Sequence, residues 1–325
     1  MARTLTILLV IVGIAIPFGA SAQEVVVAEQ LTPEERETKR AERKAKRDEA
    51  ALTQRGQMDL GGITGHPDLL LNPAGRNWRI RGAAELGFAG VLAHTIQFGE
   101  DGTELDYVKE GGQDVLFPFA RFQAELELWQ RLNISFLYQP LRLQTEPVFP
   151  EDERIDGLDF PAGTPMDLDY NFGFYRLSFQ YDFFRAPDQD LAIGLSAQIR
   201  NATISFTSAD GTLRRSTRDI GFVPIIKVEG RYTFQNGFFM GAEVDGFYAW
   251  GRYVSGSRND FDGLIVDASL RAGLPVRPVG ELYLNLRYLG GGARGTDETP
   301  DQPWQDGYTN NWLHTMALSL GLLVR

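Results

Sequence analysis

The chain has 325 residues, a formal net charge of −11 and a hydrophobic content of 43%. By composition, this acidic balance excludes a nucleic-acid-binding protein. The absence of cysteine excludes disulfides, thiolate metal sites and a lipid-modified N-terminal cysteine, so stability must come from packing and backbone hydrogen bonds.

The first segment has the features of a secretory signal peptide. Arg3 precedes an apolar run over residues 5–16, and residues 20–22, Ala-Ser-Ala, are small enough for a cleavage site. The apolar run is shorter than the roughly 20 residues that a spanning helix needs, which favours a cleaved peptide over a membrane anchor. Residues 1–22 are therefore predicted to be a signal peptide, with Gln23 as the first mature residue.

Charged residues dominate the next segment, residues 23–77. Thr32 is a suitable N-cap for a solvated helix over residues 32–55, and a linker rich in Gly, Pro and Asn follows over residues 56–77. The helix lacks an apolar a/d seam, so a coiled coil is not expected. We interpret this segment as a polar periplasmic leader. The alternative is that residues 32–55 contact cell-wall polymer or another envelope component.

From Trp78 onward the pattern changes to alternation of apolar and polar residues. After residue 22 no run approaches 18 apolar residues, so no transmembrane helix is predicted, and the remaining membrane architecture is a closed barrel. Strands of such a barrel alternate with a period of two over about ten residues. The predicted strands cover residues 78–94, 116–128, 132–139, 175–182, 191–200, 222–232, 238–245, 264–274, 282–288 and 314–324.

The connections between these strands alternate in length. Short turns are predicted at residues 130–131, 186–189, 235–237 and 275–280, and mostly longer loops at 99–113, 146–165, 207–219, 256–260 and 291–308. Outer-membrane barrels have short periplasmic turns and longer external loops, so both ends of the barrel are expected in the periplasm. A soluble sandwich would also alternate. However, every strand here has one face of Leu, Phe, Tyr or Ile, and most have a charged opposite face.

The predicted fold class is all-β, a closed antiparallel transmembrane β-barrel of about ten strands over residues 78–325, with a short charged N-terminal helix. Eight or twelve strands would also fit the pattern. Residues 78–325 resemble bacterial outer-membrane β-barrel proteins as a class, with no particular subfamily. The resemblance implies a place in the Gram-negative outer membrane, contact with lipid and lipopolysaccharide, and insertion by the barrel-assembly machinery. Such barrels commonly end in an aromatic residue, whereas this chain ends in Val324 and Arg325.

Charged residues on the inward face suggest what fills the barrel. A barrel of about ten strands is narrow, so opposed charges inside it must pair or remain desolvated at a cost of several kcal/mol each. We therefore predict a plugged lumen held by salt bridges and a structural or surface-interaction role. A narrow small-solute channel is the alternative. The predicted lumen network is Arg81, Glu85, Arg121, Glu125, Glu127, Arg176, Asp182, Arg200, Lys227, Glu229, Arg231, Glu243, Asp245, Asp267, Arg271 and Arg287.

A surface hydrolase is a third hypothesis, and it depends on His94 and His314. These histidines fall near the external rim on the first and last strands, which are neighbours in a closed barrel. Both share the outward phase of the pattern, so we interpret them as interface residues and expect no catalytic, cofactor or metal site. The acidic external loops, over residues 146–159 and 297–306, are expected to be solvated. The alternative is that they bind divalent cations or a surface ligand.

Overall fold

The computed structural model describes residues 41–44, 77–186, 188–250, 260–276, 280–297 and 305–324. The predicted signal peptide and most of the predicted leader lie outside these ranges. Residues 41–44, within the predicted charged helix, are helical. In the described part of the chain, no helix has the length and apolar character needed to cross a membrane. The chain divides into two units, Met1–Glu49 and Ala50–Arg325, and the second contains every strand.

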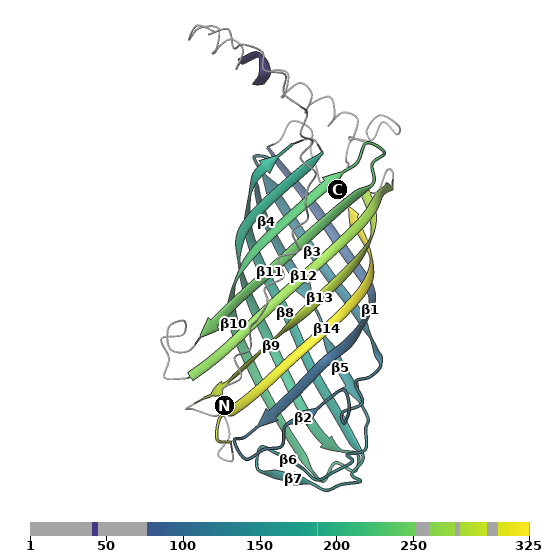
Figure 1. The fold of residues 1–325 in the computed structure, drawn as a ribbon, viewed down its shortest axis with the longest axis vertical. Helices are drawn as coiled ribbons and strands as arrows, with labels where there is room; N and C mark the ends of the chain where they lie inside the picture. Colours follow the sequence, from purple (N-terminus) through teal and green to yellow (C-terminus); the bar gives the residue numbers. More distant parts are fainter. Residues whose placement is uncertain are drawn as a thin grey trace, which may run out of the picture. The chain divides into compact units, whose positions relative to one another are not determined.

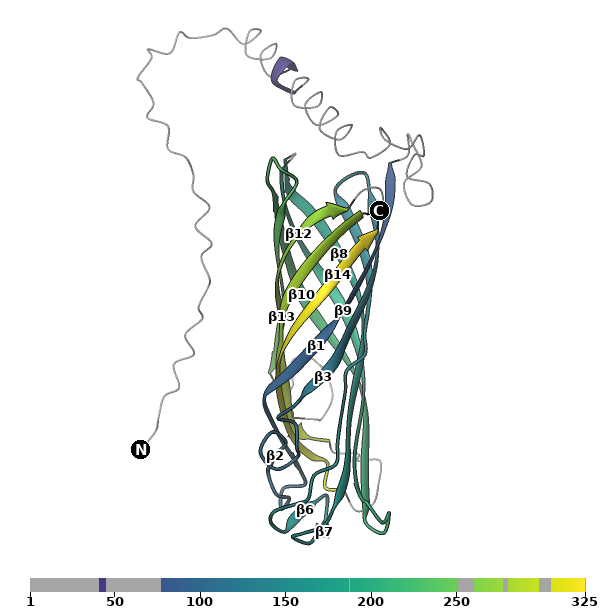
Figure 2. The ribbon, with the colours of Figure 1, turned by 90° about the vertical axis from the view of Figure 1, so that its right-hand side faces the viewer.

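Ten long strands form a closed antiparallel barrel, which confirms the predicted fold class (Figure 1 and Figure 2). Each strand pairs with its neighbour in the chain, and β14 pairs with β1 to close the wall. Three short strands lie in the loops: β2 (Leu105–Asp106), β6 (Glu153–Ile155) and β7 (Leu158–Phe160). The wall consists of β1 (Trp78–Phe98), β3 (Leu116–Leu128), β4 (Leu132–Gln139) continued by β5 (Arg142–Thr145), β8 (Met166–Arg185), β9 (Gln189–Ser208), β10 (Arg214–Thr233), β11 (Phe239–Trp250), β12 (Asp260–Val276), β13 (Gly280–Thr296) and β14 (Tyr308–Val324).

The two ends of the barrel differ in their connections. The wall begins at Trp78 and finishes at Val324 on the same end, which also has the short connections and is called here the turn end. One of these turns contains Gly237 at φ 84°, a left-handed conformation that glycine adopts without strain. The opposite end contains β2, β6 and β7 and is called the loop end (Figure 1).

Several strands are longer than the alternation predicted. Strands β9 and β10 extend to Ser208 and Arg214, so most of the predicted loop over residues 207–219 is strand. Similarly, β13 continues to Thr296, inside the predicted loop over residues 291–308. The backbone ladder continues past the end of the outward apolar pattern because hydrogen bonding between strands does not require a lipid-facing apolar side. The apolar pattern identifies only the part of each strand that contacts lipid.

The outer face of the wall is apolar, and the structure exposes the residues that the sequence placed outward. On β10, the exposed apolar side chains run from Ile220, through Phe222 at 69% exposure, to Tyr232. At about 3.3 Å per residue and a tilt near 45°, this run covers roughly 28 Å along the barrel axis, close to the thickness of a bilayer's hydrocarbon core. The exposed apolar band therefore matches a membrane-spanning wall.

Candidate functional site

The barrel interior contains three successive groups of side chains. At the turn end, charged residues surround a small vestibule. Next comes a set of seven charged side chains, the central network, in which no side chain is more than 3% exposed. At the loop end, apolar side chains fill the interior and form the apolar cap. The members of the central network are Arg121, Arg176, Lys227, Glu243, Asp245, Asp267 and Arg287.

Asp267 on β12 has three cationic partners in the central network. Its carboxylate pairs with Arg176 on β8 at 3.0 Å and with Arg121 on β3 at 3.4 Å. Arg287, on the neighbouring strand β13, also forms an ion pair with it. Side chains from four strands therefore meet at one carboxylate inside the barrel, which connects opposite parts of the wall.

The second half of the central network surrounds Lys227 on β10. Its Nζ lies 2.9 Å from a carboxylate oxygen of Glu243 and 3.3 Å from one of Asp245, both on β11. Glu243 also accepts a hydrogen bond from Arg121 at 2.9 Å, and Arg176 pairs with Asp245. Every acid of the central network therefore has at least two cationic partners, as burial of a charge requires.

Three carboxylates of the central network lie close enough together to suggest a metal site. Oxygens of Glu243, Asp245 and Asp267 lie within 4.8 Å of one another. However, these acids share the central network with four cationic side chains that bind the same oxygens. A divalent cation would have to displace those partners and would then face their positive charges. The residues do not fit a metal site.

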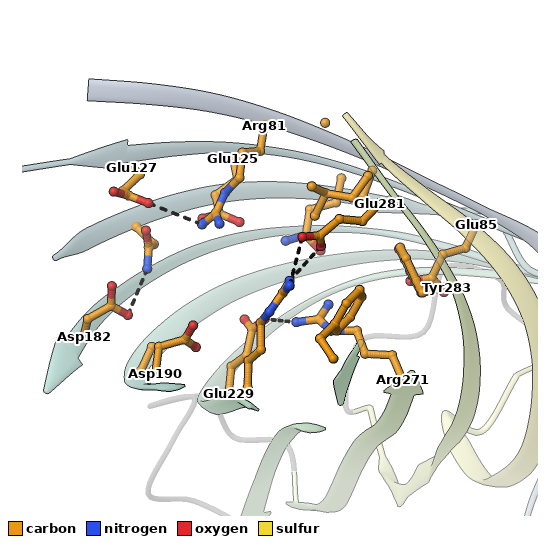
Figure 3. Close-up of a pocket in the computed structure, with 18 residues that line it drawn as sticks. Arg81, Glu85, Glu125, Glu127, Asp182, Asp190, Glu229, Arg271, Glu281 and Tyr283 are labelled. Atoms are coloured by element: carbon orange, nitrogen blue, oxygen red, sulfur yellow. Dashed lines mark hydrogen bonds and ion pairs between the residues drawn. The ribbon is translucent and has the colours of Figure 1, made fainter. Parts of the chain in front are cut away.

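The vestibule at the turn end is lined mainly by charged residues and has a volume of about 80 Å³ (Figure 3). Its arginines all have acidic partners: Arg81 pairs with Glu125 and lies 3.7 Å from Glu127, Arg231 pairs with Glu281 at 2.7 Å, and Arg271 pairs with Glu229. Two of these pairs have side-chain exposures between 16% and 24%, so water reaches the vestibule.

Glu85 on β1 is a buried carboxylate that accepts hydrogen bonds from three neutral groups. It accepts hydrogen bonds from the Tyr283 hydroxyl at 3.1 Å, the Asn285 amide at 2.9 Å and the Ser319 hydroxyl at 3.2 Å. Gly321 on β14 provides the space for the Tyr283 ring, because a Cβ at residue 321 would lie 2.2 Å from the ring carbon Cζ. Three strands thus fix the position of this carboxylate.

Fifteen of the sixteen predicted lumen residues lie in the vestibule or the central network. The exception is Arg200, which pairs with Asp219 at 2.9 Å nearer the loop end. Sequence reasoning missed Glu281 and Asp190, which also line the vestibule. Glu281 lies on the same face of the strand as Tyr283, Asn285 and Arg287. Starting the predicted strand one residue earlier would have included it.

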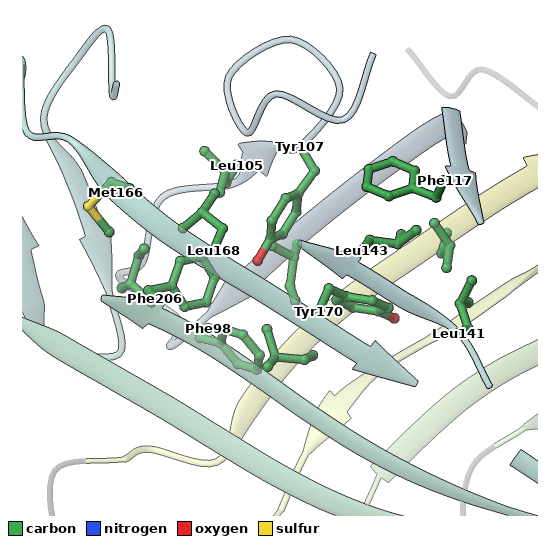
Figure 4. Close-up of a cluster of buried hydrophobic side chains, with 14 of the residues drawn as sticks. Phe98, Leu105, Tyr107, Phe117, Leu141, Leu143, Met166, Leu168, Tyr170 and Phe206 are labelled. Atoms are coloured by element: carbon green, nitrogen blue, oxygen red, sulfur yellow. The ribbon is translucent and has the colours of Figure 1, made fainter. Parts of the chain in front are cut away.

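The apolar cap was not predicted from the sequence. Loop residues fold into the barrel, where Leu105 and Tyr107 pack beside Leu168, Tyr170 and other inward residues of the wall (Figure 4). The cap is buried, apolar and rich in aromatic side chains, unlike the polar interior expected along the whole lumen. It buries Ile96, Phe98, Leu105, Tyr107, Phe117, Leu137, Leu141, Leu143, Phe149, Ile155, Phe160, Met166, Leu168, Tyr170, Phe174, Ile204, Phe206, Leu289 and Leu313.

The prediction that His94 and His314 lie together on the outer face is wrong for His94. A register shift between Val91 and Ala93 reverses the phase of β1, and His94 is fully buried inside the barrel. Its ring stacks on Tyr107 at 4.5 Å between ring centres, and its Nδ1 lies 2.8 Å from the side-chain oxygen of Gln113.

His314 lies on the neighbouring strand but keeps its outward phase. Its Nδ1 is 2.6 Å from the hydroxyl of Tyr288 on β13. Because consecutive side chains of a strand point to opposite faces, the pairing of His314 with Ala93 places it across the wall from His94. The wall separates the two rings, so the histidine pair that motivated the hydrolase hypothesis does not form.

Backbone contacts tie the loops of the loop end to one another. The Thr103 N–H donates to the Arg154 carbonyl at 2.8 Å, and the Arg154 N–H donates to the Thr103 hydroxyl oxygen. The Arg154 guanidinium also pairs with Asp101 at 2.9 Å. The Asp156 N–H donates to the Phe98 carbonyl at 3.1 Å, and the Asp156 carbonyl accepts from Arg215. These contacts hold the loops over the apolar cap.

Not all acids of these loops are solvated, contrary to expectation. Glu153 and Asp156 are 4% and 5% exposed. Burial, reinforced by the nearby negative charges of Glu110 and Glu151, raises the pKa of Glu153 to about 7. Burial also raises the pKa of Asp156. These acids are protonated more readily than free carboxyls because folding of the loops removes them from water.

The pKa of Glu153 predicts that the loops over the cap open more easily as pH rises. Folding raises the pKa of the Glu153 carboxyl from about 4.3 in the unfolded chain to about 7. The stabilisation from this carboxyl is therefore complete below about pH 4.3 and is lost as pH rises through about 7. The rate at which proteinase K cleaves these loops at pH 5.5 and at pH 8 measures how readily they open. The wild-type rate divided by the Glu153→Gln rate should rise about thirtyfold between the two pH values. A ratio independent of pH would contradict this assignment.

No protein-family model matches the chain, and no curated protein matches it. Among solved structures, it is similar to the outer membrane protease OmpT from Escherichia coli, with 14% identity over 75% of this chain and 96% of that chain and a TM-score of 0.48. It is also similar to Ail of Yersinia pestis, with 11% identity over 75% and 98% of the two chains and a TM-score of 0.32. A third similar structure is the Pseudomonas putida toluene transporter TodX, with 8% identity over 76% and 90% and a TM-score of 0.29.

The class of the protein follows from its own architecture. The antiparallel wall closes through the pairing of β14 with β1, an apolar band covers its outside, and paired charges fill much of its inside. These are the requirements for a sheet that crosses a bilayer. The chain has the architecture of a transmembrane β-barrel and resembles bacterial outer-membrane barrels as a class.

Proposed function

We propose that this protein is a sealed outer-membrane barrel that acts through its surface, and not an open pore. The main support is the central network, in which seven charged side chains at most 3% exposed connect the wall across the lumen. The apolar cap provides a second barrier at the loop end, since hydrated solutes cannot cross a buried aromatic core. Two barriers in series favour a sealed lumen over the narrow-channel alternative.

The proposed orientation places the turn end in the periplasm and the loop end outside the cell. It is supported by the lengths of the connections, because outer-membrane barrels have short periplasmic turns and longer external loops. In this orientation the leader before Trp78 is periplasmic, where residues 32–55 would meet the cell envelope. The wall contacts outer-membrane lipid, and the barrel-assembly machinery inserts it.

Planar-bilayer recordings test the sealed barrel directly. The refolded protein, shown to be folded by a heat-modifiable gel shift, should give no steady single-channel openings, because the central network and the apolar cap both block the path. Steady openings from folded wild-type protein would overturn the proposal and favour a small-solute channel with the central charges along its path.

A specific observation favours lipopolysaccharide as a surface partner. Arg214 and Arg218 point outward on β10, immediately beyond the apolar band that begins at Ile220. Both are exposed, and no acidic side chain in the described part of the chain forms an ion pair with either. Guanidinium groups bind phosphate through paired hydrogen bonds. In the proposed orientation, these arginines lie at the level of the lipid phosphates of the outer leaflet.

Replacing both arginines tests this contact. The Arg214→Gln/Arg218→Gln variant should bind purified lipopolysaccharide about thirtyfold more weakly, because it loses two charge-assisted contacts that each contribute on the order of 1 kcal/mol. Arg142→Gln is the matched control, since Arg142 is also exposed but is paired with Asp169. Equal affinity of the double variant and the control would show that the two arginines do not contact the lipid.

A further inference from the structure

We propose that the vestibule at the turn end binds a linear organic polyamine. Its lining contains seven carboxylates and three guanidinium groups, an excess of four acidic groups over basic ones. In the central network the balance is opposite, with four cationic side chains and three carboxylates. A cation entering the barrel from the turn end is therefore attracted into the vestibule and repelled at the next layer, so it is retained in the vestibule.

The arginines of the vestibule do not neutralise all of its acids. Each arginine already pairs with Glu125, Glu229 or Glu281. Glu85 accepts hydrogen bonds from the neutral groups described above. Among the described residues, no side chain forms a hydrogen bond or an ion pair with the Asp190 carboxylate, which also lines the vestibule. Both carboxylates line the same space (Figure 3). They are the acids available to a cationic ligand.

An independent observation indicates a ligand that donates hydrogen bonds. Asn133 lines the vestibule and is only 8% exposed. Its amide nitrogen donates to Asp182 at 3.2 Å, and because a carboxylate can only accept, this bond fixes the orientation of the amide. The amide oxygen of Asn133 is then a buried acceptor with no partner. An ammonium group would satisfy this oxygen and neutralise the neighbouring acids.

The spacing of the acids favours an extended cation over a metal ion. Among the described residues, the central network has the one set of three carboxylates whose oxygens lie within 4.8 Å of one another, and the vestibule has no such set. A hard divalent ion needs several oxygens around one point. A chain of ammonium groups joined by methylene units instead matches carboxylates that lie apart from one another. Ala83, Ala192 and Phe239 give the vestibule an apolar wall for those methylene units.

Isothermal titration of the refolded full chain in detergent micelles with spermidine, a linear triamine, tests the site. We expect saturable binding of one triamine per barrel, weakening as salt is added. The Glu85→Gln/Asp190→Asn variant should bind at least tenfold more weakly. Asp219→Asn, which removes an acid outside the vestibule, is the matched control and should bind like wild type. A heat-modifiable gel shift shows that each variant has folded.

Asn133→Ala separates a built site from diffuse attraction of counterions, because it leaves the charge unchanged. This variant should bind the triamine several-fold more weakly than wild type. The proposal is overturned by any of three results: no saturable binding, wild-type affinity in the Asn133→Ala or the double variant, or Mg²⁺ alone binding as tightly as the triamine. The test is independent of the sealed-barrel proposal, since binding in micelles does not depend on conductance.

Discussion

Replacing Asp267 with asparagine should lower the free energy of unfolding by about 3–5 kcal/mol, the usual cost of removing one partner from a buried ion pair. The substitution keeps the size of the side chain, so the loss comes from charge and not from a cavity. It leaves the guanidinium groups of Arg121, Arg176 and Arg287 buried beside a neutral amide. Urea unfolding in detergent micelles, followed by tryptophan fluorescence, measures this loss.

The matched control is Asp219→Asn, which removes an acid of the same type from a pair in contact with solvent. Asp219 is 55% exposed and pairs with Arg200, so the expected cost is below about 1 kcal/mol. If both substitutions had the same small effect, the central network would not hold the wall together. The double variant Asp267→Asn/Arg287→Gln should recover part of the loss, because it removes one of the cations that lose a partner when Asp267 is neutralised.

Replacing Phe206 with alanine should cost about 3–5 kcal/mol, as large-to-small substitutions in aromatic cores do. Phe206 on β9 is 1% exposed and lies within 6.1 Å of Phe98 and 6.0 Å of Tyr107, measured between ring centres. The cavity would remain at the centre of the apolar cap. Urea unfolding gives the total cost, and proteolysis of the loops shows whether the cap loosens first.

Phe222→Ala on β10 is the control for Phe206→Ala. It removes the same number of atoms from a side chain that is 69% exposed on the lipid-facing wall. Detergent or lipid replaces the lost contacts there, so the expected cost is clearly smaller. A cost for Phe206→Ala no greater than that for Phe222→Ala would show that the cap contributes little to the stability of the folded barrel.

The sequence could predict the wall because the wall is encoded locally. Side chains of a strand alternate between its faces, so an apolar band facing lipid must appear as every second residue, as in Leu318, Leu320 and Leu322. The inward phase of the same strands identified the charges of the central network. Conversely, β9 and β10 continue beyond the lipid, where β10 has no apolar pattern and β9 has its apolar residues, Ala202, Ile204 and Phe206, on the inward face, so their ends could not be predicted from a lipid-facing pattern.

By itself the sequence determined which residues face lipid, which charges face inward and roughly how many strands close the wall, since alternation depends only on near neighbours in the chain. The tertiary structure decided which charges meet, because Arg121 and Glu243 are 122 residues apart and Glu85 and Ser319 are 234 apart. It also decided the burial of His94, through a shift in pairing with β14, and the filling of the loop end by residues of the loops. These features depend on contacts between distant segments, which strand alternation does not encode.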